Sequence, residues 1–228
     1  MSPWIKICAN TSLADARLAV ESGADAVGFV FAPSPRQVTP AQVAAITPNL
    51  PDSVEKIGVF VDWEYDAIAG AVEQAVLSGV QLHYSDGQDD LAEKLRVRFG
   101  PGLRIQRVIH FGPHAARQLE LANADPNING VLVDSRTATA VGGTGVSFDW
   151  HAARATVFSG RGHLKLVAAG GLSPANVGAA IAILRPWGVD VASGVESSPG
   201  KKDQRKVSEF VANARAAFEQ FHSQGTVT

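Results

Sequence analysis

Eight short apolar runs, each followed by a helical pattern, predict that this chain of 228 residues folds as a single (β/α)8 barrel with a closed, parallel eight-stranded sheet. Such barrels usually contain about 250 residues. Because the composition does not change abruptly along the chain, we expect one α/β domain over residues 1–222 and a loose tail over 223–228. A doubly wound open sheet is the main alternative, but eight regular repeats that finish with a helix favour closure.

The expected strands are short and apolar, and most of them end at polar residues or at glycine. In chain order they are Trp4–Cys8, Ala26–Phe31, Lys56–Val61, Val80–His83, Arg104–Ile109, Val131–Val133, Leu164–Ala168 and Asp190–Ala192. In the first strand, Ile5 and Ile7 are expected to pack outward on helices. Lys6 and Cys8 then point into the barrel. A buried lysine needs a partner, and Asp190 is the candidate because closure makes the first and last strands neighbours.

Each expected helix follows one strand, and several begin at a capping residue or at proline. The helices are Leu13–Ser22, Pro40–Ile46, Glu64–Val76, Leu91–Phe99, Pro113–Ala122, Trp150–Val157, Pro174–Leu184 and Asp203–Phe221. Asn10 or Ser12 is the expected cap of the first helix, which ends at Gly23, and Ser173 is the expected cap of the seventh.

Composition excludes several classes of function. The net charge is −2, so no basic surface indicates binding to nucleic acid or to an anionic membrane. The apolar stretches are too short to span a membrane, and the N-terminus lacks the apolar region of a signal peptide. With one cysteine there is no internal disulfide, and we expect a cytoplasmic protein. Both a monomer and a homodimer are compatible with this fold.

Ligands of barrels bind at the carboxyl ends of the strands, so the residues that end the strands are the candidate site. They are Cys8, Phe31 with the following Arg36, Asp62, His83, Asp134, the Gly170–Gly171 turn and Ser193–Gly194.

Glycine-bearing loops follow the sixth, seventh and eighth strands. They contain Gly142, Gly143 and Gly145 around Thr144, then Gly170 and Gly171 before Ser173, and then Ser193 and Gly194. Loops after strands seven and eight are the usual phosphate site of a barrel, where a helix N-terminus adds partial positive charge. No GxxxxGK[ST] or GxGxxG motif is present, so we expect a phosphate ester rather than a nucleoside triphosphate or dinucleotide.

Cys8 and Asp134 have the chemistry of a base and an acid. A thiol that a nearby cation stabilises as thiolate can remove a proton from carbon, and a partly desolvated carboxyl can donate one. Such a pair suits the isomerisation of an aldose phosphate to a ketose, which needs no cofactor. No spacing of His, Asp and Glu indicates a metal site. The structural alternatives are a small buried thiol at Cys8 and a turn-capping aspartate at Asp134.

The chain resembles the phosphoribosylanthranilate isomerase family over nearly the whole barrel. The matching motifs are KICANT (6–11), GADAVGFVFAPSPRQV (23–38), KIGVFVD (56–62), VQLH (80–83), VLVDS (131–135), GGTGVSFDW (142–150), AAGGLSPANV (168–177) and WGVDVASGVESSPGKKD (187–203). The last three are specific in combination. Members are (β/α)8 barrels that catalyse the Amadori rearrangement of N-(5-phosphoribosyl)anthranilate in tryptophan biosynthesis, without a cofactor.

The resemblance implies roles for individual residues. Cys8 matches the family's general base, and Asp134 matches its general acid. Arg36 matches the arginine that holds the anthranilate carboxylate, which is reasonable because a guanidinium binds a carboxylate bidentately; the alternative is a surface arginine. The backbone at GGTG, AGGL and SGVE matches the family's phosphate site. His83 is expected to line the substrate pocket.

Two departures from the family pattern lie near this site. The family usually has glycine where this chain has Ala9 and Tyr84. Ala9 is a mild change if its φ is negative, and Tyr84 either narrows the anthranilate pocket or points to solvent.

Three other functions remain open from the sequence. A ribulose-phosphate epimerase would need metal ligands that the sequence does not indicate. A histidine-pathway isomerase typically carries aspartate at the position of Cys8. A catalytically silent barrel would bind phosphate esters, with Tyr84 filling the pocket.

Overall fold

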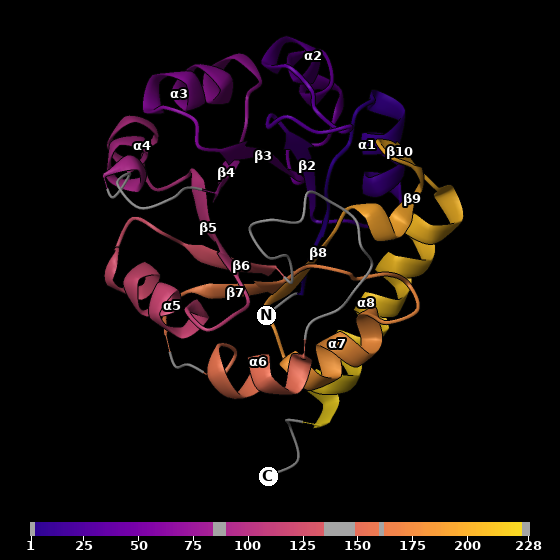
Figure 1. Ribbon diagram of the computed structural model, residues 1–228. Helices are drawn as coiled ribbons and strands as arrows, with labels where there is room; N and C mark the ends of the chain where they lie inside the picture. Colours follow the sequence, from indigo (N-terminus) through magenta and orange to yellow (C-terminus); the bar gives the residue numbers. More distant parts are fainter. Residues whose placement is uncertain (1–2, 84–89, 135–148, 160–161, 225–228) are drawn as a thin grey trace.

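The computed structural model describes residues 3–83, 90–134, 149–159 and 162–224, and in these ranges the predicted (β/α)8 barrel is confirmed. Eight parallel strands pair in sequence order and close through β1 and β8, and the helices surround them (Figure 1). The barrel strands are β1 (Trp4–Ile7), β2 (Ala26–Val30), β3 (Glu55–Val61), β4 (Gly79–His83), β5 (Arg104–His110), β6 (Gly130–Asp134), β7 (Lys165–Ala168) and β8 (Gly188–Val191).

The helices occur in the predicted order, with small differences at their ends. They are α1 (Leu13–Glu21), α2 (Pro40–Ala44), α3 (Tyr65–Gln74), α4 (Leu91–Phe99), α5 (Ala115–Ala124), α6 (Trp150–Thr156), α7 (Val177–Leu184) and α8 (Gln204–Gln224). No described helix is long and apolar enough to cross a membrane.

The caps of two helices test the sequence prediction. Ser12 caps α1 as expected, because its side chain accepts a hydrogen bond from the Asp15 amide at 3.1 Å. Ser173 does not cap α7, which begins at Val177 with Asn176 as its N-cap. The Asn176 side chain instead accepts a hydrogen bond from the Ser173 amide at 2.7 Å, so the segment before α7 forms a turn rather than helix.

The structure contains four short elements that the sequence does not predict. The 3-10 turn η1 (Thr47–Asn49) follows α2, and the 3-10 turn η2 (Ser193–Val195) follows β8. A two-stranded antiparallel ribbon of β9 (Glu196–Ser198) and β10 (Lys201–Lys202) comes after η2. Of these, η2 and the ribbon lie between β8 and α8, close to the carboxyl ends of the strands.

Successive side chains of each strand point to opposite faces of the sheet, and this alternation produces two apolar layers. The inner layer fills the barrel and contains Trp4, Ala26, Ile57, Val108, Leu132, Val167 and Ala169. The outer layer lies between strands and helices and includes Ile5 and Ile7 of β1 and Val131 and Val133 of β6. Side chains two residues from an inner residue therefore also point inward, which fixes the direction of the strand-end side chains.

Aromatic and charged side chains close the end of the barrel at which the strands begin. The Trp4 and Trp187 rings stack with centroids 5.3 Å apart. Arg104 lies 5.1 Å from the Trp187 ring and pairs with Glu55 at 2.6 Å. Ligand access is consequently at the carboxyl ends of the strands.

Candidate active site

Lys6 and Asp190 form an ion pair inside the barrel. β1 and β8 pair with Lys6 beside Asp190, and the Lys6 Nζ lies 2.9 Å from the Asp190 Oδ1. The same ammonium donates to the Gln81 Oε1 at 3.0 Å, and the Lys6 side chain has no exposed surface. The predicted inward direction of Lys6 and its pairing with Asp190 are both confirmed.

Cys8 lies directly after β1, above Lys6 on the same inner face. It is 5% exposed, and its amide donates to the Val191 carbonyl at 2.8 Å, which extends the β1–β8 pairing. Burial raises the pKa of the Cys8 thiol above its ordinary value, and the nearby Lys6 ammonium lowers it by less. Lys6 is thus the nearby cation that was expected to stabilise a thiolate. In the protein without ligand, its effect on the pKa of the thiol is smaller than the effect of burial.

Gly28 on β2 makes room for both side chains. A Cβ built at this position would lie 2.6 Å from the Cys8 Sγ and 2.8 Å from the Lys6 Cε. These atoms therefore surround one point that only glycine leaves empty.

Ala9 adopts a left-handed backbone conformation, with φ of 62°. The replacement of the family's usual glycine by Ala9 would be a mild change only if φ were negative, and φ at Ala9 is positive. A residue with a Cβ is strained here by about 1–2 kcal/mol.

The conformation predicts an unusual result for Ala9→Gly. Ala9 is 1% exposed, and Ala19 of α1 is fully buried with helical backbone. We expect Ala19→Gly to lower the free energy of unfolding by about 1.5–2 kcal/mol, from the lost methyl and the flexibility of glycine. Ala9→Gly should change it by less than about 0.5 kcal/mol, since relief of strain offsets the same losses. Urea unfolding of both variants measures this, and an equal loss in both would contradict the expectation.

Asp134 ends β6 and points toward the barrel interior. It follows Leu132 of the inner layer by two residues, and it is 3% exposed. Thus Cys8 and Asp134 lie on the inner face of the barrel at the carboxyl ends of their strands.

Two histidines lie on neighbouring strands between these residues. His83 ends β4, and its Nε2 is 3.2 Å from the Gln81 Nε2. His110, which the sequence analysis placed beyond the end of the fifth strand, is the last residue of β5 and is paired with Asp134 of β6. The two imidazole centroids are 6.0 Å apart. His110 follows Val108 of the inner layer by two residues, and that spacing is the signal that could have identified it.

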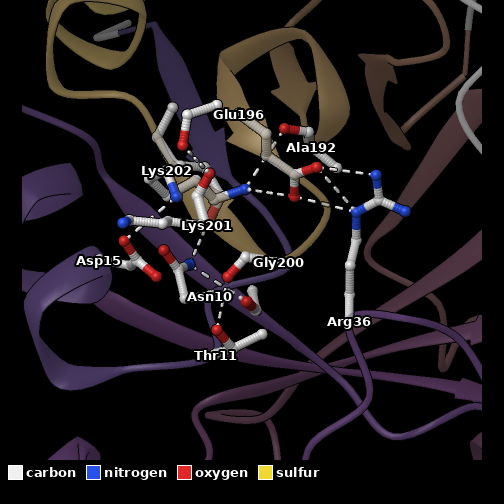
Figure 2. Close-up of polar contacts among 12 residues, drawn as sticks. Asn10, Thr11, Asp15, Arg36, Ala192, Glu196, Gly200, Lys201 and Lys202 are labelled. Carbon is white, nitrogen blue, oxygen red and sulfur yellow. Dashed lines mark hydrogen bonds and ion pairs between the residues drawn. The ribbon is translucent and has the colours of Figure 1, made fainter.

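Arg36 forms a bidentate ion pair with Glu196 (Figure 2). The Arg36 Nε and Nη2 donate to the Glu196 carboxylate at 2.9 and 2.7 Å, and Glu196 is 6% exposed. This ion pair raises the pKa of the Arg36 guanidinium. The Arg36 side chain is therefore held in place by a buried carboxylate, and 16% of it is exposed.

Lys202 contacts the same carboxylate from the other side, as Figure 2 shows. Its Nζ lies 3.3 Å from the Glu196 Oε1 and 3.3 Å from the Ala192 carbonyl. Burial lowers the pKa of Lys202, which Glu196 only partly offsets. For Glu196, burial raises the pKa, and hydrogen bonds from Arg36 and charge from Lys202 more than offset this. One carboxylate between two cations leaves this cluster with one excess positive charge.

The ribbon β9–β10 positions Glu196 and Lys202. The Thr11 hydroxyl donates to the Gly200 carbonyl at 2.6 Å, and the Lys202 amide donates to the Asp15 carboxylate at 3.2 Å. Both contacts attach the ribbon to the segment that follows Cys8 (Figure 2). Sequence reasoning missed Glu196 and Lys202; the Pro199–Gly200 pair, with Gly200 at φ 80°, is the turn signal that could have indicated a hairpin.

The loops after β7 and β8 meet at Gly194. Gly170 and Gly171 have φ of 80° and 66°, a conformation that favours glycine. A Cβ at Gly194 would collide with the Leu172 carbonyl oxygen and lie 3.2 Å from the Ser173 Cα. The structure thus brings Gly170, Gly171, Ser193 and Gly194 to one part of the rim. Gly142, Gly143 and Gly145, like Tyr84, lie outside the described residues.

Comparison with known proteins identifies relatives over almost the whole chain. Residues 5–213 match the family model described as N-(5'phosphoribosyl)anthranilate (PRA) isomerase. A protein of Trichlorobacter lovleyi named N-(5'-phosphoribosyl)anthranilate isomerase is 42% identical over 214 residues, which cover 93% of this chain and 98% of the relative.

Solved structures agree with these relatives. Phosphoribosyl anthranilate isomerase from Thermotoga maritima is similar with a TM-score of 0.81 and 37% identity, covering 94% of this chain and 99% of the other. A second structure of such an isomerase, in complex with reduced 1-(o-carboxyphenylamino)-1-deoxyribulose 5-phosphate, has a TM-score of 0.77 and 36% identity with the same coverage.

Proposed function

We propose that this chain, which belongs to the N-(5'-phosphoribosyl)anthranilate isomerase family, converts N-(5-phosphoribosyl)anthranilate to 1-(2-carboxyphenylamino)-1-deoxyribulose 5-phosphate. The observation that carries the proposal is the placement of a buried thiol, Cys8, and a buried carboxyl, Asp134, on the inner face of one barrel rim. Family membership indicates the substrate, and the positions of these side chains suit the chemistry.

Asp134 is the general acid that opens the ribose ring. It donates a proton to the ring oxygen, the bond between that oxygen and C1 breaks, and the nitrogen lone pair forms a C1=N bond. A general acid must lie within hydrogen-bond reach of the oxygen that it protonates, and Asp134 lies inside the rim with 3% of its surface exposed.

Cys8 is the general base in the second step. Its thiolate takes the proton from C2, the electron pair of that C–H bond forms C1=C2, and the C1=N electrons return to nitrogen. The resulting enol loses its hydroxyl proton while C1 gains one, which gives the ketone at C2. Because C2 is oxidised as C1 is reduced, the reaction is an intramolecular oxidation–reduction that needs no cofactor.

Arg36 and the late loops hold the two anionic ends of the substrate. Glu196 occupies the Nε–Nη2 edge of the Arg36 guanidinium. The remaining edge suits the anthranilate carboxylate, and the excess positive charge of the cluster favours an anion there. The phosphate binds to backbone amides of three loops, at 142–145, 170–171 and 193–194. His83 lines the pocket between the carboxylate and the phosphate of the substrate.

Turnover of phosphoribosylanthranilate tests the function directly. The fluorescence of this substrate should decay when native chain is added, in proportion to protein concentration. Arg98→Met should keep the native rate and is the matched control for variants of Arg36. Like Arg36, Arg98 pairs with a glutamate, Glu73, at 2.8 Å, but it is exposed. Binding of sugar phosphates without any fluorescence decay would instead establish a silent phosphate-binding barrel.

A further inference from the structure

Lys6 is a fully buried charge that takes no part in the proposed proton transfers. Its Nζ contacts Asp190 on β8 at 2.9 Å and Gln81 on β4 at 3.0 Å, so three strands hold it at one place. Replacing such a pair by apolar residues is often neutral or even stabilising, so stability alone does not account for it.

The position of Lys6 relative to Cys8 gives it a chemical consequence. The two residues share the inner face of β1, and the Cys8 Sγ and the Lys6 Cε both lie within 2.8 Å of the Cβ position that Gly28 leaves empty. The charge of the Lys6 ammonium favours the ionised form of the Cys8 thiol. A thiolate at Cys8 therefore forms beside a fixed cation.

We propose that Lys6 is a positioning residue for the base: its ammonium, fixed by Asp190 and Gln81, stabilises the Cys8 thiolate, while Asp190 limits that stabilisation by competing for the same cation. The catalytic importance of this arrangement rests on the proposed function, whereas the electrostatic coupling does not. Lys6 keeps its proton throughout. When the thiolate takes the C2 proton, an S–H bond forms, and the Lys6 charge returns to Asp190 as its main counterion.

The charged groups around Cys8 support this assignment. Those that act on the Cys8 thiol are Lys6, Asp190 and Lys202, and the thiolate in turn acts on Arg36. Lys202 and Arg36 share the Glu196 carboxylate. Lys6 has the largest effect of the charged groups and lowers the pKa of the thiol, and Asp190 raises it. Lys6 and Asp190 are thus expected to act in opposite directions, which a purely structural ion pair does not require.

Titration of the thiol in the protein without substrate tests the proposal. Cys8 is the chain's one cysteine, so the ultraviolet absorbance of thiolate reports on it alone, with Cys8→Ser as the blank. Lys6→Met should raise the midpoint of the titration by about one pH unit or more, and Asp190→Asn should lower it. The ascending limb of the pH profile of kcat/KM should move in the same directions.

Controls separate this coupling from a loss of structure. Lys56→Met removes another buried lysine, whose Nζ donates to the Pro51 carbonyl at 2.7 Å, and should leave the titration unchanged. If Lys6→Met does not fold, the double variant Lys6→Met with Asp190→Leu removes both charges and should still raise the midpoint. No movement, or movement in the same direction for Lys6→Met and Asp190→Asn, would overturn the proposal. Opposite movements without turnover in the native chain would contradict the proposed function only.

Discussion

Cys8→Ser and Asp134→Asn should each lower kcat/KM for phosphoribosylanthranilate by about 10²–10⁴-fold, the usual contribution of a positioned general acid or base. A serine hydroxyl next to Lys6 is far harder to deprotonate than a thiol, so it cannot take the C2 proton. The asparagine amide has the shape of the carboxyl but no proton to give to the ring oxygen. Both side chains are buried at the same rim, and each substitution preserves their size.

The measurement is the rate of fluorescence decay as a function of substrate concentration, with thermal unfolding to verify the fold. The double variant should lose little more than the more severely affected single variant, because the acid and base act in successive steps of one reaction. Full rate in both single variants would show that the two roles are assigned wrongly, even though the barrel is correct.

Arg36→Met should raise KM about ten- to hundredfold and change kcat much less, since a charge-assisted hydrogen-bond contact contributes about 1.5–3 kcal/mol to binding. The substrate carboxylate is remote from the reacting carbons, so its contact is retained from the bound substrate to the transition state. Steady-state kinetics measure the two parameters, and an unchanged KM would exclude the carboxylate role.

Glu196→Gln gives a graded companion to this prediction. It keeps the Arg36 charge but removes the bidentate partner that orients it, so the rise in KM should be smaller than for Arg36→Met. It also removes the charged carboxylate that pairs with the buried Lys202 ammonium, and we expect a loss of stability in addition. The exposed pair of Arg98 and Glu73 is the matched control for both variants.

The sequence predicts the regular part of this molecule well, and the physical reason is the period of two along each strand. That period orients Lys6 and Cys8 inward, and closure of the barrel makes Asp190 a neighbour of Lys6. His110 follows the same period, but the expected strand ends at Ile109, the last apolar residue, whereas β5 continues to His110.

Contacts outside the repeats could not be predicted in this way. The pairing of Arg36 with Glu196 joins a loop after β2 to the ribbon after β8, and no periodicity relates two irregular segments. The positive φ of Ala9 is equally hidden, because alanine carries no signal for a left-handed conformation. Both features depend on tertiary contacts around the rim rather than on local propensity.

The ion pair of Lys6 and Asp190 joins positions 184 residues apart in the sequence. Contacts of such separation form late, since a long stretch of chain must first be ordered between them. The surroundings of Cys8 are therefore incomplete until the eighth strand has docked against the first. During refolding, or on the ribosome, isomerase activity should therefore appear when β8 pairs with β1 and not when the helices form. Activity is then a measure of barrel closure.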